Sequence, residues 1–131
     1  MTSFLQTLLR KERADRHHII NTRNGKVVAD RVLTAFDSES RRKGLLAHRS
    51  LPASTAMIIA PTNAIHTFFM KFSIDVVFVS KDGRVLKIRP RMPAWRMTGS
   101  LRAYAVLELA AGSLDSSDTQ VGDRLAVSSE C

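Results

Sequence analysis

His66 and Asp75 lie inside an apolar run that extends from residue 65 to residue 79. The run is rich in β-branched and aromatic residues, which favour strands. A polar side chain buried in a strand needs a partner, so each of the two is either locked into a hydrogen-bond network or used at a site. His66 could act as a ligand or a general base near neutral pH, although a lone histidine on an apolar strand is more often a core residue. Asp75 is better explained by an ion pair with Arg42, or by hydrogen bonds from loop N–H groups, because an uncompensated buried carboxylate is costly.

Other chemistry is weakly supported by residue spacing. A metal site drawn from His66, Asp75 and Glu108 lacks any fixed ligand spacing such as His-x-His. No Gly-x-Ser-x-Gly elbow points to a serine hydrolase. Cys131 is the single cysteine, which excludes a disulfide within the chain and a zinc site built on cysteines. We therefore predict no metal and no cofactor.

Trp95 and Arg96 lie side by side in a long Pro-containing loop that we predict over residues 89–102. A tryptophan in a loop can form a recognition surface for a sugar ring or a peptide. It can equally cover an open sheet edge. Both interpretations stay open.

Short strands at close spacing are the elements expected to position these residues. The Asn24-Gly25 pair indicates a two-residue hairpin turn, and residues 81–84 indicate another. Asp37 or Ser38 is expected to cap a helix over about residues 39–48, and Gly44 inside it indicates close packing or the end of the helix. Strands are predicted at residues 18–22, 26–35, 57–60, 65–72, 74–79, 85–88, 104–109 and 125–127. This pattern predicts a mainly β (α+β) fold of the sandwich or barrel type, with residues 1–16 as a short N-terminal helical extension and residues 17–131 as a single domain.

Several segments resemble the uncharacterised DUF192 family, also called UPF0127, in their order and spacing. They are RKGLL at 42–46, MIIAP at 57–61, IHTFFMKF at 65–72, IDVVF at 74–78, Pro93 with Trp95-Arg96, VLELAAG at 106–112 and VGD at 121–123. The resemblance implies a compact, mostly antiparallel β fold, similar to a jelly roll or open barrel, with one central helix packed on it. It implies structural roles for Arg42, Gly44, Met70, Gly112, Gly122 and Asp123, and no established activity.

The chain departs from the family pattern at two positions. Thr62 stands where many relatives have cysteine, so a thiol mechanism is not available there. Ser73 replaces a frequent proline before the strand at residue 74. Many members also resemble exported or membrane-anchored proteins, and the expected leader pattern is missing here.

The net charge of +8 is uneven: Lys and Arg concentrate in residues 1–100, and Asp and Glu outnumber them in residues 101–131. Because the basic residues are scattered and aromatic residues make up only 6% of the chain, we expect at most weak, salt-sensitive binding of anionic polymers, and no specific nucleic-acid target. No apolar run approaches the length of a membrane span. Together with the missing leader pattern, this leads us to expect a cytoplasmic protein without a membrane span.

The function best supported by the sequence is a binding or accessory module for a small polar ligand such as a carbohydrate. The alternatives are a small hydrolase or lyase with His66 as the base, and a weak nonspecific binder of anionic polymers. We expect the ligand site to form around His66, Asp75, Trp95, Arg96 and Glu108.

Overall fold

The computed structural model of the chain describes residue 4, residues 17–45 and residues 48–129. Strands dominate this part of the chain, which confirms the mainly β (α+β) fold class. In chain order the elements are β1 (His17–Asn21), β2 (Val27–Ala29), β3 (Arg31–Ala35), α2 (Ser38–Lys43), β4 (Thr55–Ile59), β5 (Ala64–His66), β6 (Ile74–Val79), β7 (Val85–Met92), β8 (Met97–Gly99), β9 (Ala105–Ala110), α3 (Ser113–Ser117) and β10 (Leu125–Ser129). None of the described helices has the length and apolarity needed to cross a bilayer.

The strands form three sheets. Their orders are β10-β1-β2, β3-β4-β9-β6-β7 and β5-β8. In the five-stranded sheet β3 and β4 run parallel, whereas the other neighbours are antiparallel. The sheet is therefore mixed, with one parallel pair in a mostly antiparallel arrangement. The physical reason is the crossover between β3 and β4, which contains α2 and returns the chain in the same direction.

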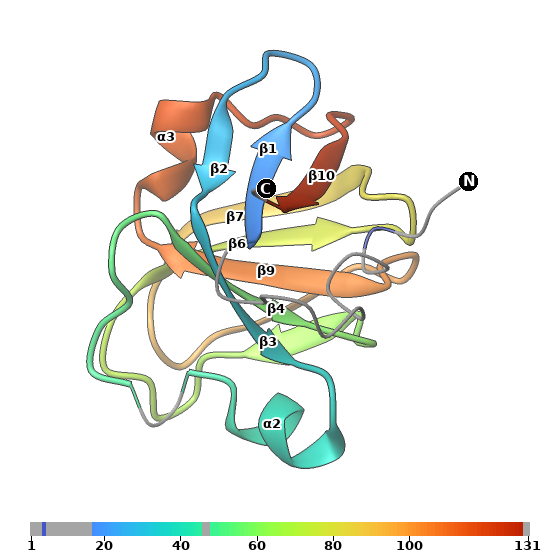
Figure 1. The fold of residues 1–131 in the computed structure, drawn as a ribbon. Helices are drawn as coiled ribbons and strands as arrows, with labels where there is room; N and C mark the ends of the chain where they lie inside the picture. Colours follow the sequence, from blue (N-terminus) through green and yellow to red (C-terminus); the bar gives the residue numbers. More distant parts are fainter. Residues whose placement is uncertain (1–3, 5–16, 46–47, 130–131) are drawn as a thin grey trace.

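The central strands of the five-stranded sheet, β4, β9 and β6, are buried on both faces. On one face the three-stranded sheet packs over it, with β1, β2 and β10 in front of β6, β7 and β9 in Figure 1. Ile19 and Leu125 of the small sheet share this core with Val77 and Leu107 of the large one. Every residue of β6 is buried. Its sequence therefore lacks the alternation of apolar and polar residues that marks a strand with one solvent-exposed face.

The second core lies on the other face of the large sheet. Val76, Phe78 and Val106 project to this side and pack with Leu45 and Met70. The cover on this side consists of loops and the β5-β8 pair, which contributes partly buried apolar side chains. The molecule thus has a third, irregular layer, and a cavity lined by Glu108 and His66 lies within it.

Helix α2 is shorter and more exposed than the expected helix over residues 39–48. It begins after Asp37, whose carboxylate accepts a hydrogen bond from the Ser40 N–H at 2.7 Å. It ends at Gly44, which has φ 46° and ψ −123°, a conformation open to glycine but strained for other residues. None of the residues in α2 is buried, so it is the following Leu45 that enters the core. The expected central helix is therefore a short helix of six residues at the surface, followed at its C-terminal end by the buried Leu45.

The run from residue 65 to residue 79 is not one strand. β5 ends at His66, and β6 begins at Ile74. Between them the chain turns through Phe69, which has a φ of 65°. The strand predicted over residues 65–72 therefore forms only at its start. The predicted loop over residues 89–102 instead holds the end of β7 and all of β8.

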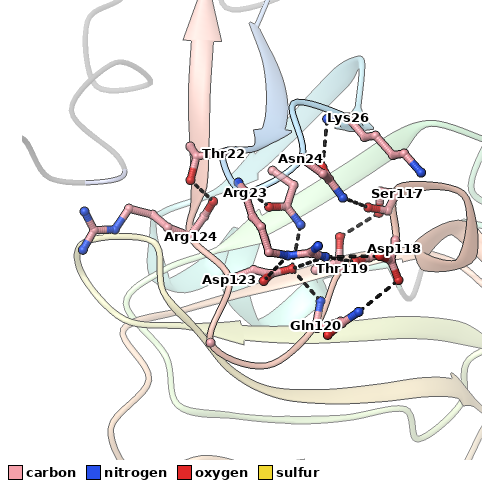
Figure 2. Close-up of polar contacts among 12 residues, drawn as sticks. Thr22, Arg23, Asn24, Lys26, Ser117, Asp118, Thr119, Gln120, Asp123 and Arg124 are labelled. Atoms are coloured by element: carbon pink, nitrogen blue, oxygen red, sulfur yellow. Dashed lines mark hydrogen bonds and ion pairs between the residues drawn. The ribbon is translucent and has the colours of Figure 1, made fainter.

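A polar cluster joins the β1–β2 hairpin to the loop before β10 (Figure 2). Asp123 accepts hydrogen bonds from Asn21 Nδ2 at 2.8 Å, Arg23 Nε at 2.7 Å and the Gln120 N–H at 2.9 Å. The hydrogen bond from Arg23 is the main reason that the pKa of Asp123 falls to about 2. Gly122, with φ 96°, turns the chain just before this carboxylate. The cluster therefore holds the β1–β2 turn and the loop before β10 together at one end of the three-stranded sheet.

The expected N-terminal helix over residues 1–16 lies outside the described residues, except for Phe4. The Phe4 N–H donates to the Lys81 carbonyl at 2.8 Å, and its side chain is buried in the first core. Phe4 therefore docks on the turn between β6 and β7.

Candidate functional site

A cavity of about 170 Å³ lies between the end of α2, strand β9 and the segment around β5. Its volume is far above the roughly 10–15 Å³ that one water needs, so it can hold a small molecule. Several lining residues are exposed, which shows that the cavity opens to solvent. The lining residues are Arg41, Arg42, Lys43, Gly44, Leu45, Ile59, Thr62, Ala64, Ile65, His66, Met70 and Glu108.

Glu108 is the buried polar group of this cavity. It projects from the centre of β9, between Met57 of β4 and Val76 of β6, and is only 3% exposed. Its carboxyl makes no hydrogen bond to any residue that the structure describes. Burial raises the pKa of Glu108 from 4.5 to about 7, because the low-dielectric surroundings disfavour the charged form.

The end of α2 closes over Glu108. A Cβ on Gly44 would lie 3.7 Å from Glu108 Oε1, in ordinary van der Waals contact, so Gly44 faces the carboxyl. Arg42 and Lys43 extend from the last turn of the helix and are exposed. Arg41 is held in place by a hydrogen bond from Nη1 to the Phe36 carbonyl at 2.7 Å. The cavity therefore combines a buried acid with a basic rim.

His66 lies at the rim of the same cavity, at the end of β5. It is exposed, so its interpretation as a core histidine is wrong. Its Nδ1 accepts a hydrogen bond from the Phe68 N–H at 3.2 Å, which leaves Nε2 as the donor in the neutral ring. The ring stacks on Phe68 with a centroid distance of 4.7 Å.

Asp75 belongs to a different environment. Its Oδ1 accepts hydrogen bonds from the N–H groups of Arg91 at 2.8 Å and Gly112 at 3.0 Å, and its Oδ2 accepts from the Leu114 N–H at 3.0 Å. Of the two arrangements expected for Asp75, the structure therefore shows the one with hydrogen bonds from loop N–H groups. The other, an ion pair with Arg42, does not form. Asp75 ties β6 to the bulged part of β7 and to the start of α3, and it does not line the cavity.

Trp95 and Arg96 lie beside the cavity rim, not in the cavity. Trp95 is 56% exposed and stacks on Phe68 with a centroid distance of 5.8 Å. The Phe69 ring also contacts it, at 4.6 Å and an interplanar angle of 60°. Because Phe68 also stacks on His66, Trp95 is linked to the rim through one ring. Arg96 is exposed, and its Nη1 donates to the Trp95 carbonyl at 3.3 Å.

The structure thus brings His66 and Glu108 to one cavity, with Trp95 next to it. Asp75 is excluded, so the triad of His66, Asp75 and Glu108 does not converge on a metal. Within the described ranges, no group of three or more His, Cys, Asp or Glu side chains could hold a metal ion.

Thr67 and Phe69 shape this surface, and only Thr67 has a recognisable signal in the sequence. Thr67 is a buried polar residue in an apolar run, which is the same signal that drew attention to His66. Phe69 gives no such signal, since its left-handed backbone follows from tertiary contacts and not from its residue type.

The comparisons with known proteins support a family and a fold. The sequence pattern of the DUF192 family, described as an uncharacterized ACR, matches residues 19–127. A UPF0127 protein of Thermococcus sibiricus is 29% identical over 112 residues, which cover 82% of this chain and 72% of that protein.

Two solved structures have a similar fold. One is a Sinorhizobium meliloti protein whose name proposes a transcription regulator, with a TM-score of 0.74, 23% identity, and coverage of 85% of this chain and 91% of that one. The other is a protein of unknown function from Novosphingobium aromaticivorans, with a TM-score of 0.71, 23% identity, and coverage of 83% and 81%. At this identity the two structures inform on the fold alone. The family match over most of the sequence is decisive: the chain belongs to the DUF192 family, also called UPF0127.

Proposed function

We propose that this protein is a binding module for a small polar ligand, and that the ligand carries hydroxyl groups, as a sugar or another polyol does. The observation that carries the proposal is the carboxyl of Glu108, which is buried, faces the cavity and has no hydrogen-bond partner among the described residues. Glu108 is only 3% exposed, so its carboxyl is poorly solvated where it meets the cavity. A ligand hydroxyl would supply the missing hydrogen bond.

The pKa of Glu108 suits a neutral ligand. With a pKa of about 7, the carboxyl is present in both protonation states near neutral pH, so it can donate to a hydroxyl oxygen or accept from a hydroxyl hydrogen. His66 adds a second polar group at the rim. The apolar side chains of Ile59, Ile65 and Met70 line the rest of the cavity and would contact the C–H face of a sugar.

Thermal unfolding in the presence of sugars, polyols and small metabolites tests the proposal. A ligand at 100 times its Kd stabilises the folded state by about 2.7 kcal/mol, which is a shift of several degrees in a domain of this size. Glu108→Leu should abolish the shift, and Glu108→Gln should keep part of it, because the amide still hydrogen-bonds. The matched control is Glu39→Leu, at an exposed glutamate of α2 whose pair with Lys43 contributes little. The proposal fails if no compound shifts the wild-type midpoint, or if Glu108→Leu responds as the wild type does.

A second candidate function is acid–base catalysis in the same cavity, and the raised pKa of Glu108 is the observation that favours it. General acids and bases work best with a pKa near the operating pH. In this candidate function Glu108, and not His66 as expected from the sequence, would act as the general base. Mass spectrometry of any stabilising compound after incubation separates the two functions. A catalyst would convert the compound, and Glu108→Gln would bind it without conversion.

A further inference from the structure

Four aromatic rings lead outward from the rim of the cavity, in the order His66, Phe68, Trp95 and Phe69, and we call them the aromatic row. Successive ring centroids are 4.7, 5.8 and 4.6 Å apart, and the first two pairs are stacked. The outer two rings are the most accessible: Trp95 is 56% exposed and Phe69 is 70% exposed. Large aromatic side chains in contact with one another rarely stay in solvent without a function.

Thr67 holds the aromatic row in place. It is fully buried, and its hydroxyl donates to the Pro93 carbonyl at 2.7 Å and accepts from the Arg96 N–H at 2.9 Å. Its own N–H donates to the Arg96 carbonyl at 2.8 Å, and its carbonyl accepts from the Trp95 N–H at 3.0 Å. The two loops that carry the rings are thereby joined through one residue, so the rings are preorganised on a rigid support.

The backbone at the two outer rings is strained. Phe69 and Trp95 both have a φ of 65°, in the left-handed region that bulky residues rarely occupy. The surrounding structure therefore keeps two large apolar side chains pointing outward against their backbone preference. Strain of this kind gathers at ligand-binding segments.

The two segments that carry the aromatic row are basic in sequence, and Arg96 lies directly beside Trp95. Residues 64–72 and 89–102, which carry the rings, contain five basic residues and no acidic one. These are Lys71, Arg89, Arg91, Arg96 and Arg102. Arg91 pairs with Asp115, whereas Arg96, next to Trp95, is exposed and contacts only backbone carbonyls. An occupant of this surface should therefore carry both negative charge and flat apolar groups.

We infer that the aromatic row binds unpaired, single-stranded nucleic acid without sequence preference. Exposed rings beside basic side chains are the common design of such sites, because every base has a face that can stack and every nucleotide has a phosphate. Bases would stack on Phe69 and Trp95, and Arg96 would contact the phosphates. A duplex would bind more weakly, because its bases are already stacked on each other. This site lies outside the cavity and does not depend on the small-ligand proposal.

Trp95 is the single tryptophan of the chain, so its fluorescence reports directly on stacking at the row. The probes are oligothymidine and oligouridine of about 12 nucleotides, within the usual range of site sizes, a duplex of equal length, and an abasic deoxyribose-phosphate strand of equal charge. Both single strands should quench Trp95, with affinity that falls steeply as salt rises. The duplex and the abasic strand should bind at least several-fold more weakly. Equal affinity for the abasic strand would overturn the inference, since binding would then be electrostatic only.

Phe69→Ala tests the ring contribution while keeping the reporter, and should weaken oligothymidine binding about 5- to 100-fold, the usual effect of losing one stacked base. Leu101→Ala is the matched control, because Leu101 is an exposed apolar side chain (95%) away from the aromatic row. It follows the Gly99 end of the β5-β8 pair, whereas His66 lies at the opposite end, paired with Met97.

Arg96→Gln should reduce the slope of log affinity against log salt by about one. Glu108→Gln should bind oligothymidine as the wild type does, which separates this site from the cavity. Unchanged affinity in Phe69→Ala, at an unchanged melting temperature, would refute the inference, as would tight binding of an acidic aromatic peptide with no binding of the oligonucleotides.

Discussion

Asp75 and Glu108 lie on adjacent strands of one sheet, one position apart in register, and face opposite sides of it. In the β6–β9 pairing Asp75 is opposite Leu109, and Glu108 is opposite Val76. Since neighbouring residues of a strand alternate in direction, the two carboxyls are separated by the sheet. Asp75 meets three backbone N–H groups, whereas Glu108 meets a cavity. One carboxyl is therefore part of the framework, and the other is available for a ligand.

Asp75→Ala should lower the free energy of unfolding by about 3 kcal/mol or more. The substitution leaves three N–H groups without their acceptor, and each unsatisfied buried group costs about 1–3 kcal/mol. Asp75→Asn keeps one acceptor oxygen and should cost less. Urea unfolding of both variants measures the effect, with Asp30→Ala at an exposed aspartate as the control. Wild-type stability in Asp75→Ala would contradict the structural role.

Glu108 should make the protein less stable as pH rises from about 4.5 to about 7. Its pKa is about 7 in the folded state and about 4.5 when unfolded, so between these values the folded state binds more protons. The stabilisation is complete below pH 4.5 and is lost through pH 7, by about 3 kcal/mol in total. Glu108→Gln should remove this loss and be more stable than the wild type at pH 8. Unfolding of both proteins from pH 5 to pH 8 checks it, because histidine titration is common to the two. If the free energies of unfolding of the wild type and of Glu108→Gln changed equally with pH, the raised pKa of Glu108 would be excluded.

Asp123 should show the opposite dependence on pH. Its pKa is lowered from 3.8 to about 2 by its hydrogen bond with Arg23, so its stabilisation is present above pH 4 and is lost as pH falls towards 2. At pH 7, Asp123→Asn should lower the free energy of unfolding by about 1–2 kcal/mol, an amount limited by solvent screening of the half-exposed Arg23. The difference from the wild type should shrink below pH 4. A difference that stays constant down to pH 2 would count against the ion pair.

Thr67→Val should loosen the loops that carry the aromatic row. The substitution preserves shape but removes the hydroxyl that joins Pro93 and Arg96, at a cost of about 1–3 kcal/mol. Thr67→Ser keeps the hydroxyl and serves as the control. Acrylamide quenching of Trp95 fluorescence should increase in Thr67→Val and stay near wild type in Thr67→Ser. Equal quenching in all three proteins would show that Thr67 does not position Trp95.

The sequence alone determines the family, the mainly β fold class and the local turns. The chain turns at Asn24-Gly25 as expected, with Gly25 at φ 72° and β1 paired with β2. The connection is longer than the expected two-residue turn, since β1 ends at Asn21 and β2 begins at Val27. The turn at residues 81–84 joins β6 to β7 in the same way. These features depend on backbone preferences of residues close in sequence, so they can be predicted without knowing the rest of the fold.

The tertiary structure decides the mixed sheet, the separation of Asp75 from Glu108 and the exposure of His66. Strand β6 is buried on both faces, and a strand without a wet face carries no pattern that shows which face each polar residue takes. The parallel pairing of β3 with β4 and the joining of the two loops by Thr67 depend on residues distant in sequence. The cavity at Glu108 and the aromatic row arise from these long-range contacts, because both lie where separate segments meet.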